Sequence, residues 1–189
     1  MKTYRYKGYK ISVSLIQAVY DEPVKIDGYD KTLQLEELDF CKLIEIRVDL
    51  YGDIKRILLV ASYHTPVDSF VAMHDDGLFL MLNDVLCIFD PVTLEITHKT
   101  TISPLGTMFE VHQFGKDYIL YGEIEIYRIS ENLNEKWSFS GADIFVRCGS
   151  SLPAFEMKDD RICLYDWLDN YYEIDYDGNV ITDILKDYL

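Results

Sequence analysis

Short apolar runs alternate with polar turns along most of the chain, and this pattern predicts strands rather than helices. Every second residue is apolar in residues 9–15 and again in residues 42–50, as in strands with one buried face. The turn at Tyr51-Gly52-Asp53 and the apolar run at 57–62 complete a predicted hairpin. Residues 32–40 fit a short helix as well as a strand, since both periodicities match.

One pattern of strands and turns is written three times, in residues 70–99, 108–139 and 154–184. Each copy opens with a phenylalanine-led strand, at Phe70, Phe109 or Phe155. Two further apolar runs, a polar turn and a closing strand follow in each copy. The opening phenylalanines are 39 and 46 residues apart, which is the length of a unit with four short strands.

A unit of this length and strand number is the signature of a propeller blade. Residues 70–184 therefore resemble tandem blades of the WD40-like or quinoprotein-like β-propellers, in pattern only. No Trp-Asp pair ends a strand, no Gly-His pair opens a blade, and the sialidase Asp-box is absent. The resemblance implies an all-β, antiparallel, propeller-like array of about three four-stranded units, preceded by an N-terminal β-hairpin region. The alternative is an antiparallel β-sandwich or meander.

The repeats suggest an N-terminal β region at 1–66, either separate or part of the same domain, and a repeat region at 67–189. Three blades are fewer than the four to eight of closed propellers. There are three ways to resolve this: the N-terminal region supplies further strands, the array stays open, or several chains associate to complete it. Residues 140–153 lengthen the second spacing, and Ile144 and Val146 predict one additional strand there.

The cysteines indicate a reducing compartment. Cys41, Cys87 and Cys163 lie within apolar runs, and Cys148 lies in the segment between the second and third copies. This scatter predicts buried, reduced thiols and a cytoplasmic protein rather than a disulfide framework. No apolar run approaches the ~20 residues of a membrane span, and nothing near Met1 resembles a signal peptide.

The negative charge is concentrated in the repeats. Residues 70–189 hold 8 Lys and Arg against 22 Asp and Glu, a net of −14, while the whole chain carries −15. Such a field repels nucleic acid and anionic membranes and attracts basic proteins. The alternative is that the charge serves solubility alone.

No catalytic motif stands out. His74 and His112 occupy corresponding places in successive repeats, and with Glu110 and Asp75 they could offer ligands to a metal. The third repeat has Lys158 at that place, so the sequence predicts neither a metal nor another cofactor. Residues 175–179 begin like a calcium loop but lack its downstream glutamate, which favours a hairpin turn. Residues 150–151 are serines without the surrounding elbow of a nucleophile.

The third repeat carries the densest acidic stretch, with seven carboxylates from Asp159 to Asp177 against Arg161 alone. Trp167 lies among them, which suggests an aromatic anchor ringed by carboxylates; the alternative is that its indole folds back onto the blade edge. Strand alternation predicts Tyr172, Ile174 and Tyr176 to face inward. The predicted partner-binding residues are Asp159, Asp160, Asp166, Trp167, Asp169, Tyr171 and Glu173.

These features favour a non-catalytic acidic protein-binding module with a basic partner. Its sharpest form is a cytoplasmic immunity or inhibitor protein for a basic toxin such as a nuclease, a similarity of general character and not of motif. One alternative is a propeller-like enzyme or small-ligand-binding protein with a site near His74 and His112. Another is a scaffold that completes a propeller as a homo-oligomer.

Overall fold

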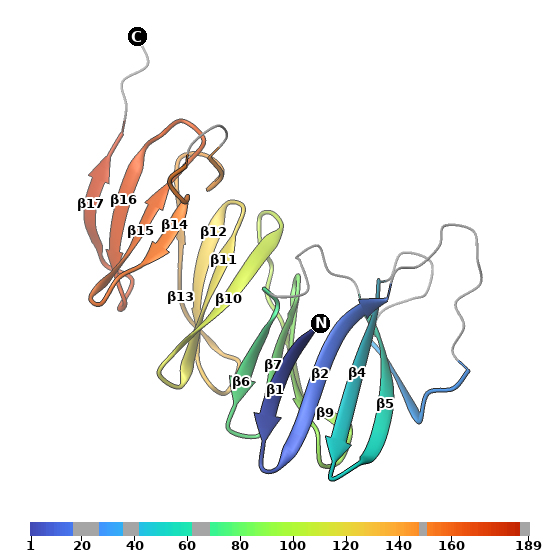
Figure 1. Cartoon of the computed structure of the whole chain (residues 1–189). Coiled ribbons are helices and arrows are strands. Elements are labelled where there is room, and N and C mark those ends of the chain that lie inside the picture. The colour runs from blue at the N-terminus through green and yellow to red at the C-terminus, as the bar shows by residue number, and fades with distance from the viewer. Residues whose placement is uncertain (17–26, 36–41, 62–68, 148–150, 186–189) are drawn as a thin grey trace, which may run out of the picture. The chain divides into compact units, whose positions relative to one another are not determined.

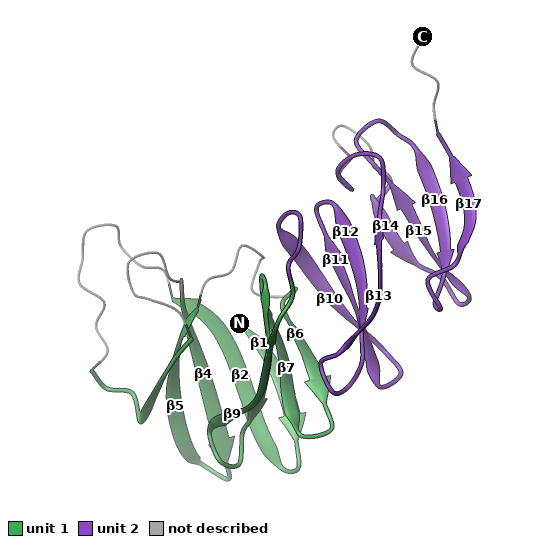
Figure 2. Ribbon diagram, turned by 180° about the vertical axis from the view of Figure 1, so that it is seen from behind, with its two compact units in different colours: residues 1–102 green, residues 103–189 purple. Residues whose placement is uncertain are grey.

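The computed structural model describes residues 1–16, 27–35, 42–61, 69–147 and 151–185. These residues form seventeen strands and no helix, which confirms the all-β prediction. The described part accordingly contains no helix long and apolar enough to span a membrane. The chain divides into two compact units, residues 1–102 and 103–189 (Figure 2).

Unit 1 begins with a five-stranded sheet in the order β1-β2-β4-β5-β3 (Figure 1). Its strands are β1 (Lys2–Tyr6), β2 (Tyr9–Ile16), β3 (Lys31–Gln34), β4 (Lys42–Leu50) and β5 (Asp53–Ala61). The predicted β4–β5 hairpin turns at Tyr51 and Gly52, which have φ of 54° and 95°. Residues 31–34 are a strand, and β3 pairs with β5 in parallel, in contrast to the antiparallel pairing elsewhere in the sheet.

The first blade completes unit 1 as an antiparallel meander. Its strands are β6 (Val71–His74), β7 (Gly77–Leu82), β8 (Val85–Asp90) and β9 (Glu95–Thr101). It packs on the five-stranded sheet through an aliphatic core that includes Ile11, Ile46, Leu59, Leu80 and Cys87. The hydroxyls of Tyr4 and Tyr6 donate to the backbone carbonyls of Val71 and Asp75, at 3.3 and 3.1 Å.

Unit 2 contains two further antiparallel blades, each with four strands in chain order. The second blade is β10 (Met108–Phe114), β11 (Asp117–Gly122), β12 (Glu125–Ile129) and β13 (Glu135–Ser140). The third blade is β14 (Phe155–Met157), β15 (Arg161–Tyr165), β16 (Tyr171–Asp175) and β17 (Val180–Ile184). The predicted set of about three four-stranded units is therefore confirmed.

The second and third blades share a core that is rich in aromatic side chains. Tyr121, Phe145 and Tyr172 are buried in it beside Ile119 and Ile162. At one end of this core, Phe114 stacks on Tyr176 with 3.9 Å between ring centroids. Beside that stack the indole Nε1 of Trp137 donates to the carbonyl of Tyr176 at 3.0 Å. Rings and hydrogen bonds thus hold these two blades together.

The strand predicted around Ile144 and Val146 is wrong, because residues 141–147 form no strand. Phe145 is instead fully buried in the aromatic core, in an edge-to-face contact with Tyr172. Its N–H donates to the carbonyl of Glu123, and its own carbonyl accepts from the Tyr121 hydroxyl. The apolar residues of this segment therefore reflect the burial of one side chain, that of Phe145, and not a paired strand.

The turn before the last strand is built alike in each blade. Asp90, Ser130 and Asp175 each accept a backbone N–H of the turn with their own side chains. A residue with positive φ completes each turn, namely Leu94, Leu133 or Gly178. Residues 175–179 are therefore the predicted hairpin turn.

The described cysteines agree with the prediction for them, since Cys87 and Cys163 are free thiols and both are buried. Cys41 and Cys148 lie outside the described residues.

Candidate functional site

The candidate partner-binding residues do not form one patch. Asp159 and Asp160 lie in the β14–β15 turn, whereas Asp166, Trp167 and Asp169 lie in the β15–β16 turn. These turns are at opposite ends of β15, which has five residues (Figure 1). At ~3.3 Å per residue, the two ends are roughly 15 Å apart. The site therefore has to be considered as three surfaces: two turns and the sheet face between them.

Asp166 organises the β15–β16 turn from inside and has no exposed surface. Its carboxylate accepts the backbone N–H groups of Leu168 and Asn170, at 3.0 and 2.9 Å. It also accepts the side-chain amide of Asn170 at 2.7 Å and the hydroxyl of Tyr172 at 2.9 Å. The prediction that Asp166 contacts a partner is therefore wrong, because four donors already surround a buried carboxylate.

Trp167 projects from this turn with 49% of its surface exposed. Its backbone N–H donates to the carbonyl of Ile144 at 2.7 Å, so the turn is also tied to the segment that carries Phe145. The neighbouring Leu168 is exposed as well, at 37%. The indole does not fold away into the blade, and the backbone that presents it is held on both sides. We refer to Trp167, Leu168 and Asp169 as the Trp167 turn.

Arg147 neutralises the Trp167 turn. Its guanidinium lies 2.9 Å from the carboxylate of Asp169 and 4.3 Å from the ring centroid of Tyr165. With Asp166 buried and Asp169 paired, the expected ring of free carboxylates around the indole is absent from this turn. The turn is instead an apolar projection with one ion pair beside it.

The outward face of the third blade holds Tyr171 and Glu173 in a polar network. Glu173 accepts from Tyr171 Oη at 2.6 Å, Arg161 at 3.0 Å and Thr182 Oγ1 at 3.0 Å. These donors hold the pKa of Glu173 below its usual value, and the hydrogen bond from Tyr171 has the largest effect. Burial, followed by hydrogen bonds to Cys163 and Glu173, raises the pKa of Tyr171. The predicted alternation is confirmed for Tyr172 and Ile174, which face the core.

An acidic end lies at the other side of the third blade, where the β14–β15 and β16–β17 turns meet because Arg161 pairs in register with Asp175. Asp160 is bound to Arg161 at 2.8 Å, and Asp177 is 86% exposed. Between them, burial and then the charges of Asp159 and Asp160 raise the pKa of Tyr176. Asp175 and Asp177 also belong to this end and are not among the predicted partner-binding residues, although hairpin register places them beside Asp159.

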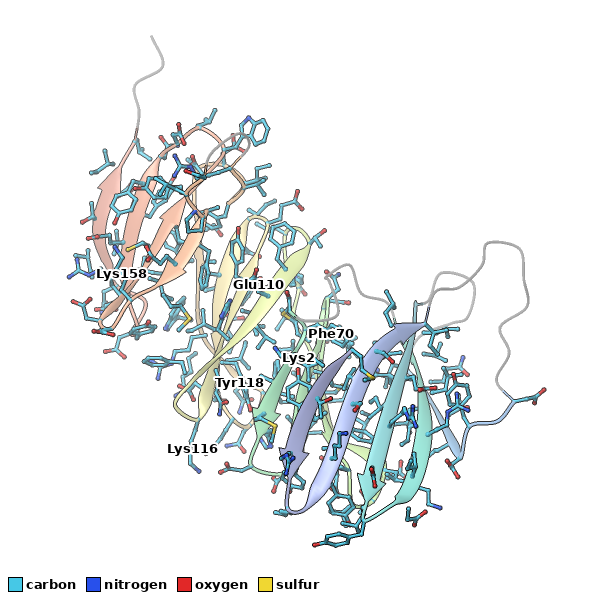
Figure 3. All side chains as sticks on the ribbon, in the orientation of Figure 1. Lys2, Phe70, Glu110, Lys116, Tyr118 and Lys158 are labelled. Atoms are coloured by element: carbon cyan, nitrogen blue, oxygen red, sulfur yellow. The ribbon has the colours of Figure 1, made fainter. Side chains whose placement is uncertain are left out.

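The two candidate histidines lie in different units, and each has partners within its own unit. His112 Nε2 lies 2.8 Å from Glu110 Oε2, two residues away on β10, and its ring lies against Phe155 at 5.0 Å (Figure 3 labels Glu110). This hydrogen bond lowers the pKa of Glu110. His74 belongs to unit 1, where its Nδ1 accepts the N–H of Asp76 at 2.9 Å. In the described ranges, no three His, Cys, Asp or Glu residues are grouped as metal ligands.

A shallow pocket of about 440 Å³ lies at the hairpin ends of the five-stranded sheet. Its lining includes Arg5, Lys7 and Lys10 with Tyr6 and Tyr51. Tyr51 is 93% exposed and the three cations are exposed too. Because these side chains are exposed, the pocket defines no ligand.

Comparisons with known proteins give a likeness in fold only. No protein-family model matches the chain, and no curated protein matches it in sequence. Among solved structures, it is similar to the AfRom2 CNH domain (9% identity, 78% of this chain, 48% of that chain, TM-score 0.45). It is also similar to KlHsv2 with loop 6CD replaced by a Gly-Ser linker (9% identity, 75% of this chain, 46% of that chain, TM-score 0.44). A third similar structure is BamB from Moraxella catarrhalis (11% identity, 80% of this chain, 49% of that chain, TM-score 0.43).

These three solved structures are propeller-type proteins, and the chain spans about half the length of each. At such low identities and TM-scores the likeness carries no inference about function. The propeller-like character of the chain rests on the strand pairing of its own three blades.

Proposed function

We propose that this chain is a non-catalytic protein-binding module that engages a basic partner through the Trp167 turn. The observation that carries the proposal is a half-exposed indole on a turn held by the fully buried Asp166. A large aromatic side chain presented by a preorganised backbone loses little entropy on binding, which is the usual property of an interface hot spot.

The charge of unit 2 supports a basic partner. Residues 103–189 hold 17 Asp and Glu against 7 Lys and Arg, a net of −10. Such a field speeds the approach of a cationic surface at low ionic strength and is screened as salt rises. At the acidic end of the third blade, Asp159 and Asp177 are both exposed to solvent. We therefore assign steering to the acidic end and anchoring to the Trp167 turn.

In its finer form, the proposal is that the partner is a basic toxin and the chain its cytoplasmic inhibitor. A nuclease needs a cationic surface for the phosphate backbone, and an acidic protein could cover that surface. The support for this form is the charge alone, together with the absence of a catalytic motif in the sequence.

The proposal is tested by measuring the binding kinetics of a captured partner with two variants. Trp167→Ala should raise the off-rate about 30-fold, which corresponds to ~2 kcal/mol for an anchoring aromatic side chain. Leu105→Ala is the matched control, since Leu105 is also a large apolar residue of unit 2 and is 68% exposed. Equal off-rates for the two variants would reject the Trp167 turn as the anchor.

A second variant tests whether the fixed backbone matters. Asp166→Asn keeps the indole but disturbs the carboxylate that holds the turn, so it should weaken binding through a slower on-rate and a faster off-rate. Circular dichroism should show that the blades remain folded. For the finer form, co-expression with a basic toxin from the same genome should restore growth with the wild-type chain and fail with Trp167→Ala.

A further inference from the structure

The last strand of the third blade has a free edge. The order β14-β15-β16-β17 places β17 at the end of its sheet, and within the described residues no strand pairs with its outer side. Alternate backbone N–H and C=O groups of such an edge point away from the sheet. They are satisfied by water or by another extended chain, so the chemistry of the edge specifies an extended peptide.

Exposed side chains distinguish this edge from the corresponding edges of the other blades. Strand β9 presents Glu95, His98 and Lys99 to solvent, and β13 begins with Glu135 and Lys136. Charged residues of this kind protect an edge from pairing. Strand β17 exposes Val180, Ile181 and Ile184 at 52, 49 and 56%, with Leu185 following at 56%. The only charged side chain within β17 is Asp183.

The charge around the edge decides between possible occupants. A second copy of this chain would bring another β17 with its own Asp183 and a unit of net charge −10. Self-pairing is therefore opposed by repulsion, whereas an extended segment with lysine or arginine is attracted. The strand register also places this edge near the Trp167 turn, because Ile184 pairs with Tyr171, two residues after the end of that turn. Figure 1 shows the end of β17 and the β15–β16 turn at the same end of the blade.

We propose that the basic partner adds an extended segment to the free edge of β17, as a fifth strand of the third blade. This inference rests on the proposed function, because it takes the basic partner from there. Backbone hydrogen bonds give the segment its orientation. Apolar side chains of the segment cover exposed aliphatic residues of β17, and its lysine or arginine side chains pair with the acidic surroundings.

The test uses the full chain and a fluorescent ten-residue peptide of alternating valine and lysine, measured by fluorescence anisotropy. The peptide should bind saturably, and methylation of every second backbone nitrogen should weaken it at least about tenfold, because N-methylation removes the donors of one edge. A valine–glutamate peptide should not bind. No saturable binding at millimolar valine–lysine peptide, or equal binding after N-methylation, would overturn the proposal.

Edge variants locate the binding. Val180→Lys with Ile184→Lys copies the protection of β9 and should weaken the peptide at least about tenfold. The matched control is Val92→Lys with Leu105→Lys: it adds the same charge at exposed positions, and Val92 is 52% exposed like Val180. Equal weakening by both pairs would show that charge alone binds the peptide and would overturn the proposal.

Three further outcomes separate this proposal from others. Sedimentation that reveals a dimer lost in the Val180→Lys, Ile184→Lys variant would assign the edge to a second copy and overturn the proposal. If a partner loses affinity with Trp167→Ala but not with the edge lysines, the proposed function stands and the strand addition fails. If the edge lysines matter and Trp167→Ala does not, the edge is correct and the anchor is wrong.

Discussion

The two units bury their apolar surface in different ways. The five-stranded sheet and first blade of unit 1 meet mainly through aliphatic side chains such as Ile46, Leu59 and Leu80. Two tyrosine hydroxyls add hydrogen bonds to backbone carbonyls of the first blade. The second and third blades of unit 2 meet through aromatic rings and through hydrogen bonds from Arg128 and Trp137 to the carbonyl of Tyr176. Aliphatic side chains are stabilised by close packing, which has no preferred direction. A buried tyrosine hydroxyl or carboxylate needs a hydrogen-bond partner at a fixed position.

The polar anchors of unit 2 are therefore what hold its exposed features in place. Asp166 orients the Trp167 turn, and Asp117 and Arg128 lie beside Phe114, which stacks on Tyr176 of the third blade. The difference indicates that unit 1 is governed by packing and that unit 2 combines packing with the placement of a surface. Four experiments can break or sharpen this contrast.

The largest effect should follow truncation in unit 1. Phe70 is fully buried in the aliphatic core (labelled in Figure 3), and Phe70→Ala should lower the free energy of unfolding by about 3–5 kcal/mol. Because this core contains no Asp, Glu or His side chain, the loss should be the same at pH 5 and pH 8. Urea denaturation at both pH values measures it, and a strongly pH-dependent loss would contradict a packing-governed unit.

Asp117→Asn should have the next largest effect. Burial opposes the charge of Asp117, but Lys136 and Arg128, both at 2.7 Å, prevail and lower its pKa. Its stabilising contribution is thus fully present above the unfolded pKa of ~3.9 and is lost as pH falls through the lower folded value. The variant should cost about 3 kcal/mol at pH 7, as expected for one half of a buried pair.

The free energy of unfolding at low pH provides the control for the Asp117→Asn experiment. Wild type and variant should converge once the pH has fallen below the lowered pKa of Asp117, where the wild-type carboxylate is protonated as well. If the difference between them persisted at low pH, the loss would be due to changed packing and not to charge.

A smaller effect should separate backbone strain from contact between blades. Gly178 has φ of +87°, and a Cβ there would lie 2.7 Å from the Trp137 ring. Gly52 has φ of +95° with nothing within 4 Å, so Gly52→Ala measures the conformational cost alone, about 1–2 kcal/mol. Gly178→Ala should cost that amount and more. Equal losses in thermal or urea unfolding would show that Trp137 moves aside freely.

Two of the four native thiols, Cys87 in unit 1 and Cys163 in unit 2, provide the most sensitive reporters. Cys87 has no exposed surface, and burial raises its pKa to about 12, so it should react with thiol reagents only when unit 1 opens. Cys163 lies on the outward face of the third blade with 3% exposure and should react faster. Mass spectrometry of labelled peptides distinguishes them. In Asp117→Asn, only Cys163 should accelerate; acceleration of both would mean that the units open together.

Period-two alternation and the repeated turns were enough to predict the three blades. The strand positions follow directly from runs such as 78–82 and 162–165, because a strand in a stacked sheet needs apolar residues at these positions. The parallel pairing of β3 with β5 could not be predicted, since residues 31–34 carry no signal of their partner. The burial of Phe145 was not predicted, because one buried ring outside a strand produces no periodic pattern in the sequence.

The candidate site was harder to predict because charge was counted without direction. Asp166 and Asp169 occupy the same turn, yet one carboxylate is buried and the other pairs with Arg147. The sequence contains the necessary hint for Asp166, since Asp166 and Asn170 repeat the spacing of Asp175 and Asn179, where an aspartate closes a turn through its own side chain. The free edge of β17 was visible as aliphatic residues in the closing strand, where β9 has charges.

The order in which unit 1 is assembled has a consequence for its synthesis. The inner face of the five-stranded sheet is complete at Ala61, but the side chains that cover it come from residues 70–89 of the first blade. At ~5–20 residues per second, a ribosome needs on the order of 1–6 s to supply that cover. During this interval Ile11, Ile46 and Leu59 have no native neighbours from the first blade. A nascent chain paused between these points should therefore be a good substrate for chaperones that bind aliphatic surfaces.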